Sequence, residues 1–187
     1  PEKKEVKNRL NDDDMVSFIP MNDLGICQKD FKSDLTEPLS EVINSYTYFA
    51  ENDVLLAKIT PCFENGKLGV ARGLSNGVGF GSSEYIVFRG NENSDPDYLF
   101  YYLCREKFRV EGAKNMHGAV GHKRVAKEFI ENYPINLPPI EKQKEIVISL
   151  DCLSSNIEET ISIYRKKIAS LNEFKQSLLQ KAFRGEL

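Results

Sequence analysis

The sequence predicts an α+β chain, in which a mixed, sheet-centred globular domain is followed by one long C-terminal α-helix. Nearly all glycines, most aromatic residues and the strand-like runs precede Leu137-Pro138-Pro139, and no proline follows this tripeptide. After residue 141, apolar residues recur every three or four positions, which is the spacing of an amphipathic helix. We therefore divide the chain into residues 1–137 and 138–187.

Strand-like runs fill the middle of the first part. Residues 53–59 (DVLLAKI) predict a strand that enters the core, and residues 83–89 (SEYIVFR) are rich in the aromatic and β-branched residues that strands favour. Asn65-Gly66 and Asn76-Gly77 are turn dipeptides of the kind found in tight hairpins. Residues 67–72 between them alternate apolar and polar, as in a half-buried strand. We expect these strands to form one curved sheet.

Two helices are expected before the proline pair. Asp95-Pro96 predicts a helix start, with aspartate as the N-cap and proline in the first turn, and we expect this helix to end near Gly112. The side chains it directs inward are Tyr98, Leu99, Tyr102 and Leu103. A second, short helix is expected to carry Val125 and Phe129 on one face.

The last segment predicts a single continuous helix with one apolar stripe. Over residues 141–186 such a helix is about 70 Å long, and a domain of this size cannot cover it along its whole length. We therefore expect an antiparallel coiled coil with a partner helix. A local hairpin that turns near Tyr164 is the alternative, although no glycine, proline or asparagine cluster marks a turn there. The stripe consists of Ile146, Leu150, Leu153, Ile157, Ile161, Tyr164, Ile168, Leu171, Phe174 and Leu178.

Charge is distributed unevenly along the chain. The net charge of −3 taken alone argues weakly against nucleic-acid binding, but residues 105–127 hold seven basic residues against two acidic ones. On charge alone, an ordinary solvated face is the favoured interpretation of this basic segment. No run approaches the roughly 18 apolar residues of a membrane span, and no secretory signal is visible at the N-terminus.

The cysteines and histidines do not predict a metal site. The four cysteines are scattered without a CxxC pair, and only His117 and His122 could add imidazole ligands. We expect no metal, free thiols and a reducing cytoplasm.

Several separate segments resemble the DNA specificity subunits of type I restriction-modification enzymes. Residues 136–143 (NLPPIEKQ), followed by Ile146-Val147, resemble the "PLPP(L/I)xEQxxIV" junction, and residues 48–62 resemble the "GD(V/I)L.A(K/R)I" strand of the target-recognition domains. Asn52 replaces the usual glycine of that strand, and Lys142 occupies the variable position before glutamine. The resemblance covers about residues 15–187. Its further segments are 64–67, 79–85, 118–125 and 171–187.

The resemblance implies a non-catalytic protein without a cofactor. Residues 1–137 would be the DNA target-recognition domain, which reads one half of a bipartite site in double-stranded DNA. Residues 138–187 would be the conserved helical spacer, which docks the methyltransferase subunits and, indirectly, the restriction subunit. Family members usually contain two such domains and two such helices, so we expect a half-subunit or a fragment. Pro61-Cys62 matches the nucleophile of cytosine methyltransferases, but no cofactor-binding glycine motif precedes it, and we interpret Cys62 as structural.

Two kinds of DNA contact are required of such a domain. Basic side chains neutralise phosphates, and side chains with paired donors and acceptors read base edges. The candidates for phosphate contact are Lys58, Lys67, Arg72, Lys114, Lys123 and Arg124. The candidates for base contact are Thr60, Ser82, Ser83, Asn115 and His117. Each has a plainer alternative, since Lys67 follows a turn and His117 could simply pack against its neighbours.

Two functional hypotheses remain open at this stage. In the first, two copies pair through their stripes as a two-fold homodimer, and their recognition domains read half-sites about two DNA turns apart. In the second, the chain is a coiled-coil adaptor that binds proteins and not DNA. The salt dependence of binding to random duplex DNA distinguishes the two.

Overall fold

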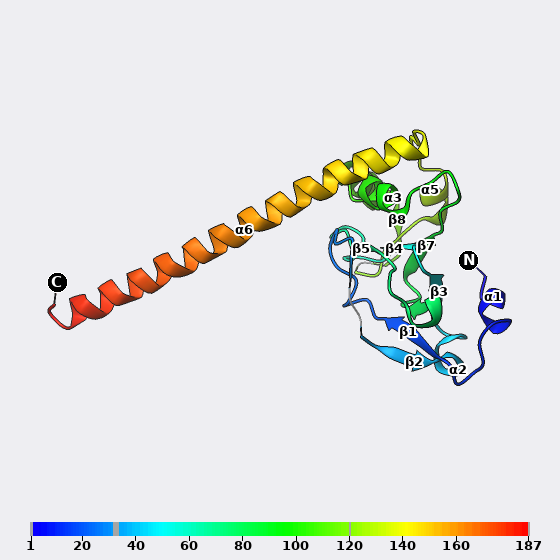
Figure 1. Cartoon of the computed structure of the whole chain (residues 1–187), viewed down its shortest axis with the longest axis horizontal. Coiled ribbons are helices and arrows are strands. Elements are labelled where there is room, and N and C mark those ends of the chain that lie inside the picture. Colours follow the sequence, from blue (N-terminus) through cyan, green and yellow to red (C-terminus); the bar gives the residue numbers. More distant parts are fainter. Residues whose placement is uncertain (1, 32–33, 120, 187) are drawn as a thin grey trace. The chain divides into compact units, whose positions relative to one another are not determined.

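The structure is a computed structural model that describes residues 2–31, 34–119 and 121–186 (Figure 1). The chain forms two compact units, Pro1–Lys144 and Glu145–Leu187. The first contains every strand of the described residues, and the second contains most of one long helix. The functional boundary between residues 137 and 138 stays a prediction.

The first unit contains short strands and short helices. The strands are β1 (Met15–Ile19), β2 (Thr36–Pro38), β3 (Thr47–Ala50), β4 (Val54–Ala57), β5 (Leu68–Val70), β6 (Val78–Gly81), β7 (Tyr85–Phe88), β8 (Met116–His117) and β9 (Arg124–Val125). The helices are α1 (Lys4–Lys7), α2 (Leu39–Val42), the 3-10 turn η1 (Ser75–Gly77), α3 (Pro96–Leu103), α4 (Glu106–Lys114) and α5 (Lys127–Glu131), and the long helix is α6 (Ile140–Phe183).

The strands form three small sheets, so the expectation of one curved sheet was wrong. The largest has the order β2-β1-β6-β3, the second has the order β5-β4-β7, and β8 pairs only with β9. Within the first sheet, β1 and β6 run parallel and the other pairs are antiparallel. The chain changes sheet at Asn52, whose φ of 65° reverses its direction between β3 and β4. Asparagine is among the few residues that tolerate this left-handed conformation, which explains why it can replace glycine here.

Strand β4 is buried on both faces, which accounts for its unbroken apolar sequence. Val54 and Leu56 face a core that also contains Phe63, Phe100 and Phe108, whereas Leu55 and Ala57 face a second core on the other side of the sheet. The strand predicted over residues 53–59 is thus confirmed, and so is the one over residues 83–89, where β7 pairs with β4. The Asn76-Gly77 turn is also present, with positive φ at both residues.

The helix predicted from Asp95 is shorter than expected. Asp95 caps it as predicted, because its side chain accepts hydrogen bonds from the backbone of Asp97 and Tyr98. The helix ends at Leu103, however, and α4 begins after Arg105, whose backbone is extended (ψ 136°). This break lets α3 bury Phe100 and Leu103 while α4 buries Phe108 against Phe63. Tyr98, Leu99 and Tyr102 are only half-buried.

Val125 belongs to a strand and not to the helix that was expected to hold it. It pairs with Met116 across the β8–β9 hairpin, and both side chains are buried in the core that contains Phe108. Phe129 lies on α5, where its ring stacks on that of Phe108. Val125 and Phe129 therefore pack in one shared core, although they belong to two different elements.

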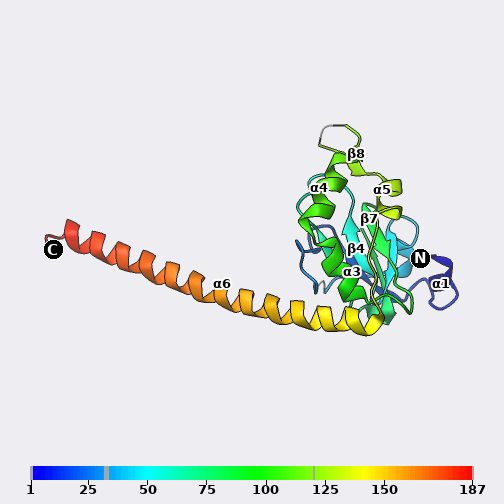
Figure 2. The same ribbon diagram turned by 90° about the horizontal axis from the view of Figure 1, so that it is seen from above.

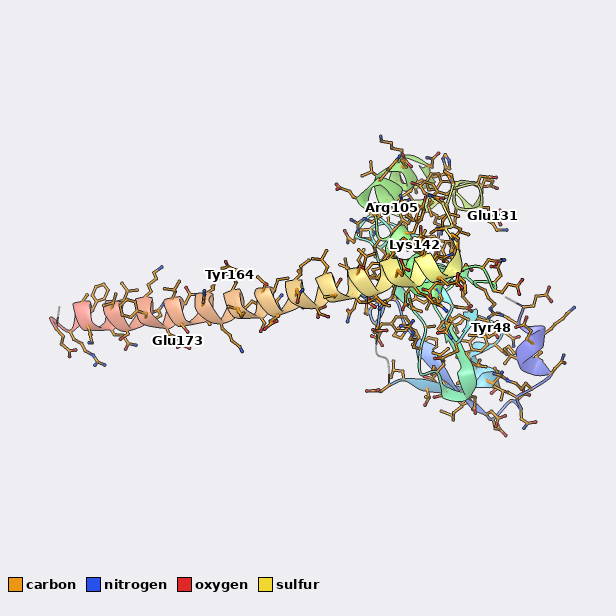
Figure 3. All side chains as sticks on the ribbon, turned by 45° about the horizontal axis from the view of Figure 1, so that its top comes forward. Tyr48, Arg105, Glu131, Lys142, Tyr164 and Glu173 are labelled. Atoms are coloured by element: carbon orange, nitrogen blue, oxygen red, sulfur yellow. The ribbon has the colours of Figure 1, made fainter. Side chains whose placement is uncertain are left out.

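Helix α6 is continuous from Ile140 to Phe183, which confirms the predicted helix and excludes the hairpin near Tyr164. Ile146 and Leu150, at its beginning, are half-buried. Eight stripe residues from Leu153 onward have exposed fractions between 36% and 66%. Figure 3 labels Tyr164 and Glu173 on this helix. A helix with so many exposed large apolar side chains is typical of one that pairs with another helix.

Candidate nucleic-acid interface

The β8–β9 hairpin is attached to the chain that leaves the central strand β4. Arg124 forms a β-bridge with Ile59, the Thr60 N–H donates to the Lys123 carbonyl (2.9 Å), and the Val125 N–H donates to the Lys58 carbonyl (2.9 Å). These bonds place Lys58 and Thr60 beside the hairpin. Figure 2 shows β8 and the helices around it at one end of the first unit, away from α1.

The loop before β7 joins the same group. The Lys58 N–H donates to the Glu84 carbonyl (2.9 Å), and Lys58 Nζ donates to the Ser83 carbonyl (2.9 Å). Ser82 Oγ accepts a hydrogen bond from the Glu84 N–H (3.2 Å), which fixes the turn into β7. Three segments far apart in sequence therefore meet at one place, which we call the hairpin cluster. Nine of the eleven predicted DNA-contact residues belong to it: Lys58, Thr60, Ser82, Ser83, Lys114, Asn115, His117, Lys123 and Arg124.

The remaining two candidates, Lys67 and Arg72, have their charges engaged elsewhere. Lys67 Nζ donates to the Met21 carbonyl (2.6 Å). Arg72 forms ion pairs with Asp97 (2.6 Å) and Asp30 (3.1 Å). Burial lowers the pKa of Arg72, but these two carboxylates raise it above its usual value. Both side chains therefore connect segments within the first unit, and the structure does not bring their charged groups to the hairpin cluster.

An acidic residue that the sequence analysis missed lies within the hairpin cluster. Glu84 accepts three hydrogen bonds from Arg124, one from Nη2 (2.7 Å) and two from Nε (2.9 and 3.1 Å). The hydrogen bond with Arg124 lowers the pKa of Glu84, burial opposes this shift, and the charges of Arg124 and Lys58 lower it further. Arg124 is thus oriented by a fixed carboxylate. The only signal for Glu84 in the sequence was a single acidic residue at the start of a predicted strand.

The basic segment at residues 105–127 is less free than its charge suggests. Arg105 lies over the Tyr102 ring at 3.4 Å, and Arg109 donates to Cys27 Sγ. Three more basic side chains form ion pairs with neighbouring glutamates, namely Lys107 with Glu111, Arg124 with Glu84, and Lys127 with Glu131. Arg105 and Glu131 are labelled in Figure 3. Five of the seven basic residues are therefore engaged within the first unit.

The two remaining lysines are the exposed charges of the hairpin cluster. Lys114 ends α4 and Lys123 precedes β9, and both are exposed. Within residues 2–31, 34–119 and 121–186, the side chains of Lys114, Lys123 and His117 make no hydrogen bond or ion pair. Asn115 is also exposed, but its Nδ2 donates to the Glu111 carbonyl (2.9 Å). Thr60 Oγ1 donates to Glu64 Oε1 (2.9 Å).

A cavity of about 600 Å³ opens beside this cluster, along β7, and is lined mainly by apolar side chains. Its charged lining residues are Lys58, Lys127 and Glu131, and the last two form an ion pair with each other. It therefore offers a ligand mostly apolar surface. Among the described residues, no group of three or more His, Cys, Asp or Glu side chains is placed to hold a metal ion. No helix of the described residues is long and apolar enough to cross a membrane.

Comparison with known proteins decides the family. The family described as "Type I restriction modification DNA specificity domain" matches residues 3–172, which is most of the chain. The chain belongs to this family. The family and the relatives described below are named for specificity, which confirms the expectation of a protein that is not an enzyme.

Relatives of this specificity domain are specificity subunits of restriction enzymes. The chain is 34% identical over 167 residues to the type I restriction enzyme EcoAI specificity subunit of Escherichia coli, and 37% identical over 138 residues to the EcoEI specificity subunit of the same organism. These matches cover 89% and 73% of the chain. The chain spans only 28% and 23% of the length of these two relatives.

Solved structures share the fold of the specificity domain. A chain from a study of complex assembly and conformational transition of the type I R-M system matches with a TM-score of 0.68 and 21% identity, over 92% of this chain and 39% of its own length. The HsdS subunit from Thermoanaerobacter tengcongensis matches with a TM-score of 0.63 and 22% identity, over 82% of this chain and 38% of its own length. The predicted α+β fold with a long C-terminal helix is therefore confirmed.

Proposed function

We propose that residues 1–137 read one half of a bipartite DNA site through the hairpin cluster, and that α6 docks the methyltransferase subunits. The observation that supports this most strongly is the convergence of nine predicted contact residues on one exposed hairpin and its neighbours. In this proposal Lys114 and Lys123 neutralise phosphates, whereas His117 and Asn115 lie between them and contact base edges. Arg124 is held by Glu84 through Nε and Nη2, so in this proposal it orders the hairpin around the contact residues.

The phosphate contacts are tested by the salt dependence of binding to random duplex DNA. A chain carrying both Lys114→Gln and Lys123→Gln should bind more weakly, and the slope of log K against log salt should become less negative by about 2, because each lost phosphate contact removes about one. Lys7→Gln is the matched control, since Lys7 is exposed on α1 and this helix lies away from β8 in Figure 2.

Either of two results would contradict the phosphate contacts. The double variant could keep the slope of the parent chain, or Lys7→Gln could reduce the slope as much as the double variant does. A parent chain that binds no DNA at any salt concentration would favour the protein-binding adaptor instead. The half-site itself is found by co-purifying the chain with a cognate methyltransferase and mapping methylated adenines on a plasmid. A recurrent two-part motif is the expected result.

We propose further that two copies of the chain pair in antiparallel fashion through the stripe of α6, as a two-fold dimer. The exposed stripe residues support this, because isolated in water they would leave a long apolar surface uncovered. Sedimentation at tens of micromolar should give twice the chain mass of 21.3 kDa. Ile161→Asp should return the monomer mass. Ile163→Asp should not, because Ile163 is similarly exposed (46% against 43%) but lies on another face of the helix. A monomeric parent chain would exclude this dimer.

A further inference from the structure

Two cysteines from distant parts of the first unit lie side by side. Cys27 lies in the segment that follows β1, and Cys104 is the C-cap of α3. The Cys27 thiol donates to the Cys104 carbonyl at 3.9 Å, so the Cys27 sulfur lies against Cys104. All four cysteines of the chain are free, and both members of this pair are half-buried. The two residues are therefore in contact, and both remain reachable by a small reagent.

The Cys27 sulfur atom is closely surrounded by other residues of the first unit. Arg109 Nη1 on α4 donates to Cys27 Sγ at 3.2 Å. The Cys27 N–H donates to the Gly66 carbonyl (2.8 Å), and a side chain at Gly66 would collide with both the Arg109 guanidinium and the Cys27 sulfur. Cys27 itself has a φ of 42°, a conformation that non-glycine residues keep only when their surroundings hold them in it.

The two thiols are chemically unequal. The hydrogen bond with Cys104 lowers the pKa of the Cys27 thiol most, burial raises it, and the charge and hydrogen bond of Arg109 lower it again, to about 7. The pKa of Cys104 is raised, first by its hydrogen bond with Cys27 and then by burial. A thiolate flanked by a cation and by a protonated second thiol is the arrangement of a reactive cysteine and its resolving partner.

We propose that Cys27 and Cys104 form an oxidisable pair, which a low-molecular-weight disulfide converts into an internal disulfide. The Cys27 thiolate attacks one sulfur of the small disulfide, forms a mixed disulfide and expels one thiolate. Cys104 then loses its proton and attacks Cys27 Sγ, which expels the second thiolate. The chain loses two electrons and two protons, and the small disulfide gains them as two thiols. The new bond fastens the segment after β1 to the junction of α3 and α4.

The test is exposure of the intact chain to excess glutathione disulfide, followed by peptide mapping by mass spectrometry without reduction. The expected product is a linked pair of peptides containing Cys27 and Cys104, lighter by two hydrogen atoms than their sum. The exposed Cys152 should carry only a mixed disulfide, and it serves as the internal control. Dithiothreitol should reverse both products.

Variants separate the two steps of the reaction. Cys104→Ser should stop at a mixed disulfide on Cys27. Arg109→Gln should slow the modification of Cys27 by about fivefold, because the cation that stabilises the thiolate is gone. Lys107→Gln, on the same helix, should leave the rate unchanged. The proposal fails if the parent chain accumulates a stable mixed disulfide on Cys27 without the internal link, or if Cys27 reacts no faster than Cys152.

Discussion

The two units of this specificity domain handle their apolar residues in opposite ways. In Pro1–Lys144, large side chains such as Phe108 and Phe63 are completely buried in cores shared by several elements. In α6, the stripe residues from Leu153 to Leu178 remain exposed. The first unit therefore carries within itself the contacts that stabilise it, whereas the helix carries an exposed apolar surface, which the proposed partner helix would cover. Paired substitutions, one in each unit, measure how far this difference extends.

The largest difference is expected for two phenylalanines. Phe108→Ala should lower the free energy of unfolding of the first unit by about 3–5 kcal/mol, because it leaves a cavity among Phe63, Phe129 and Tyr133. Phe183→Ala should leave it unchanged, because Phe183 is 90% exposed. Urea titration followed by tyrosine fluorescence reports this unit, which holds seven of the eight tyrosines. Equal losses in the two variants would refute the contrast.

A smaller difference is expected for two glutamines. Gln143 is fully buried, and its amide accepts from the Asp95 N–H (2.9 Å) and donates to the Asn93 and Pro138 carbonyls (both 2.8 Å). Gln143→Ala should cost about 2 kcal/mol of unfolding free energy, since three backbone groups lose their partner. The exposed Gln176 provides the control, as Gln176→Ala should shift the urea midpoint very little. An unchanged midpoint in Gln143→Ala would show that water replaces the amide.

The smallest difference is expected for two glutamates and depends on pH. Folding holds the pKa of Glu84 below its unfolded value of about 4.3, so its bond to Arg124 stabilises the fold at pH 7. That stabilisation should decline as the pH falls below about 4.3 and through the lowered pKa. Glu84→Gln should therefore be slightly less stable than the parent at pH 7 and should converge with it in acid. Glu158→Gln, on the exposed helix, should track the parent throughout; a constant gap for Glu84→Gln would contradict the pairing.

Sequence patterns predicted the elements whose signal is continuous along the chain. Strand β4 has an apolar residue at every position, and α6 repeats its apolar spacing without interruption, so both could be recognised locally. The break in the helix after Cys104 could not be recognised locally, because no glycine or proline marks it; it accompanies the burial of Phe108 in the core. Helix ends of this kind depend on tertiary packing, which is not visible in a local sequence pattern.

The candidate contact residues show the same limit more sharply. Lys67 and Arg72 are basic residues near turns, but the atoms that engage them belong to Met21, Asp30 and Asp97, far away in sequence. Glu84 was overlooked for the converse reason, because its partner lies forty positions further along the chain. Residue type selects candidates for DNA contact, and only the folded chain shows which charges are already neutralised.

In the β8–β9 hairpin, the residues that anchor it in the core alternate with residues that are exposed. Met116 and Val125 point into the core, while their neighbours His117 and Arg124 are exposed. Randomising His117 and Lys123 in a combinatorial library therefore changes the chemistry presented to a ligand without touching the anchor. Such a hairpin can acquire new binding preferences through a few substitutions at exposed positions, with almost no loss of folding stability.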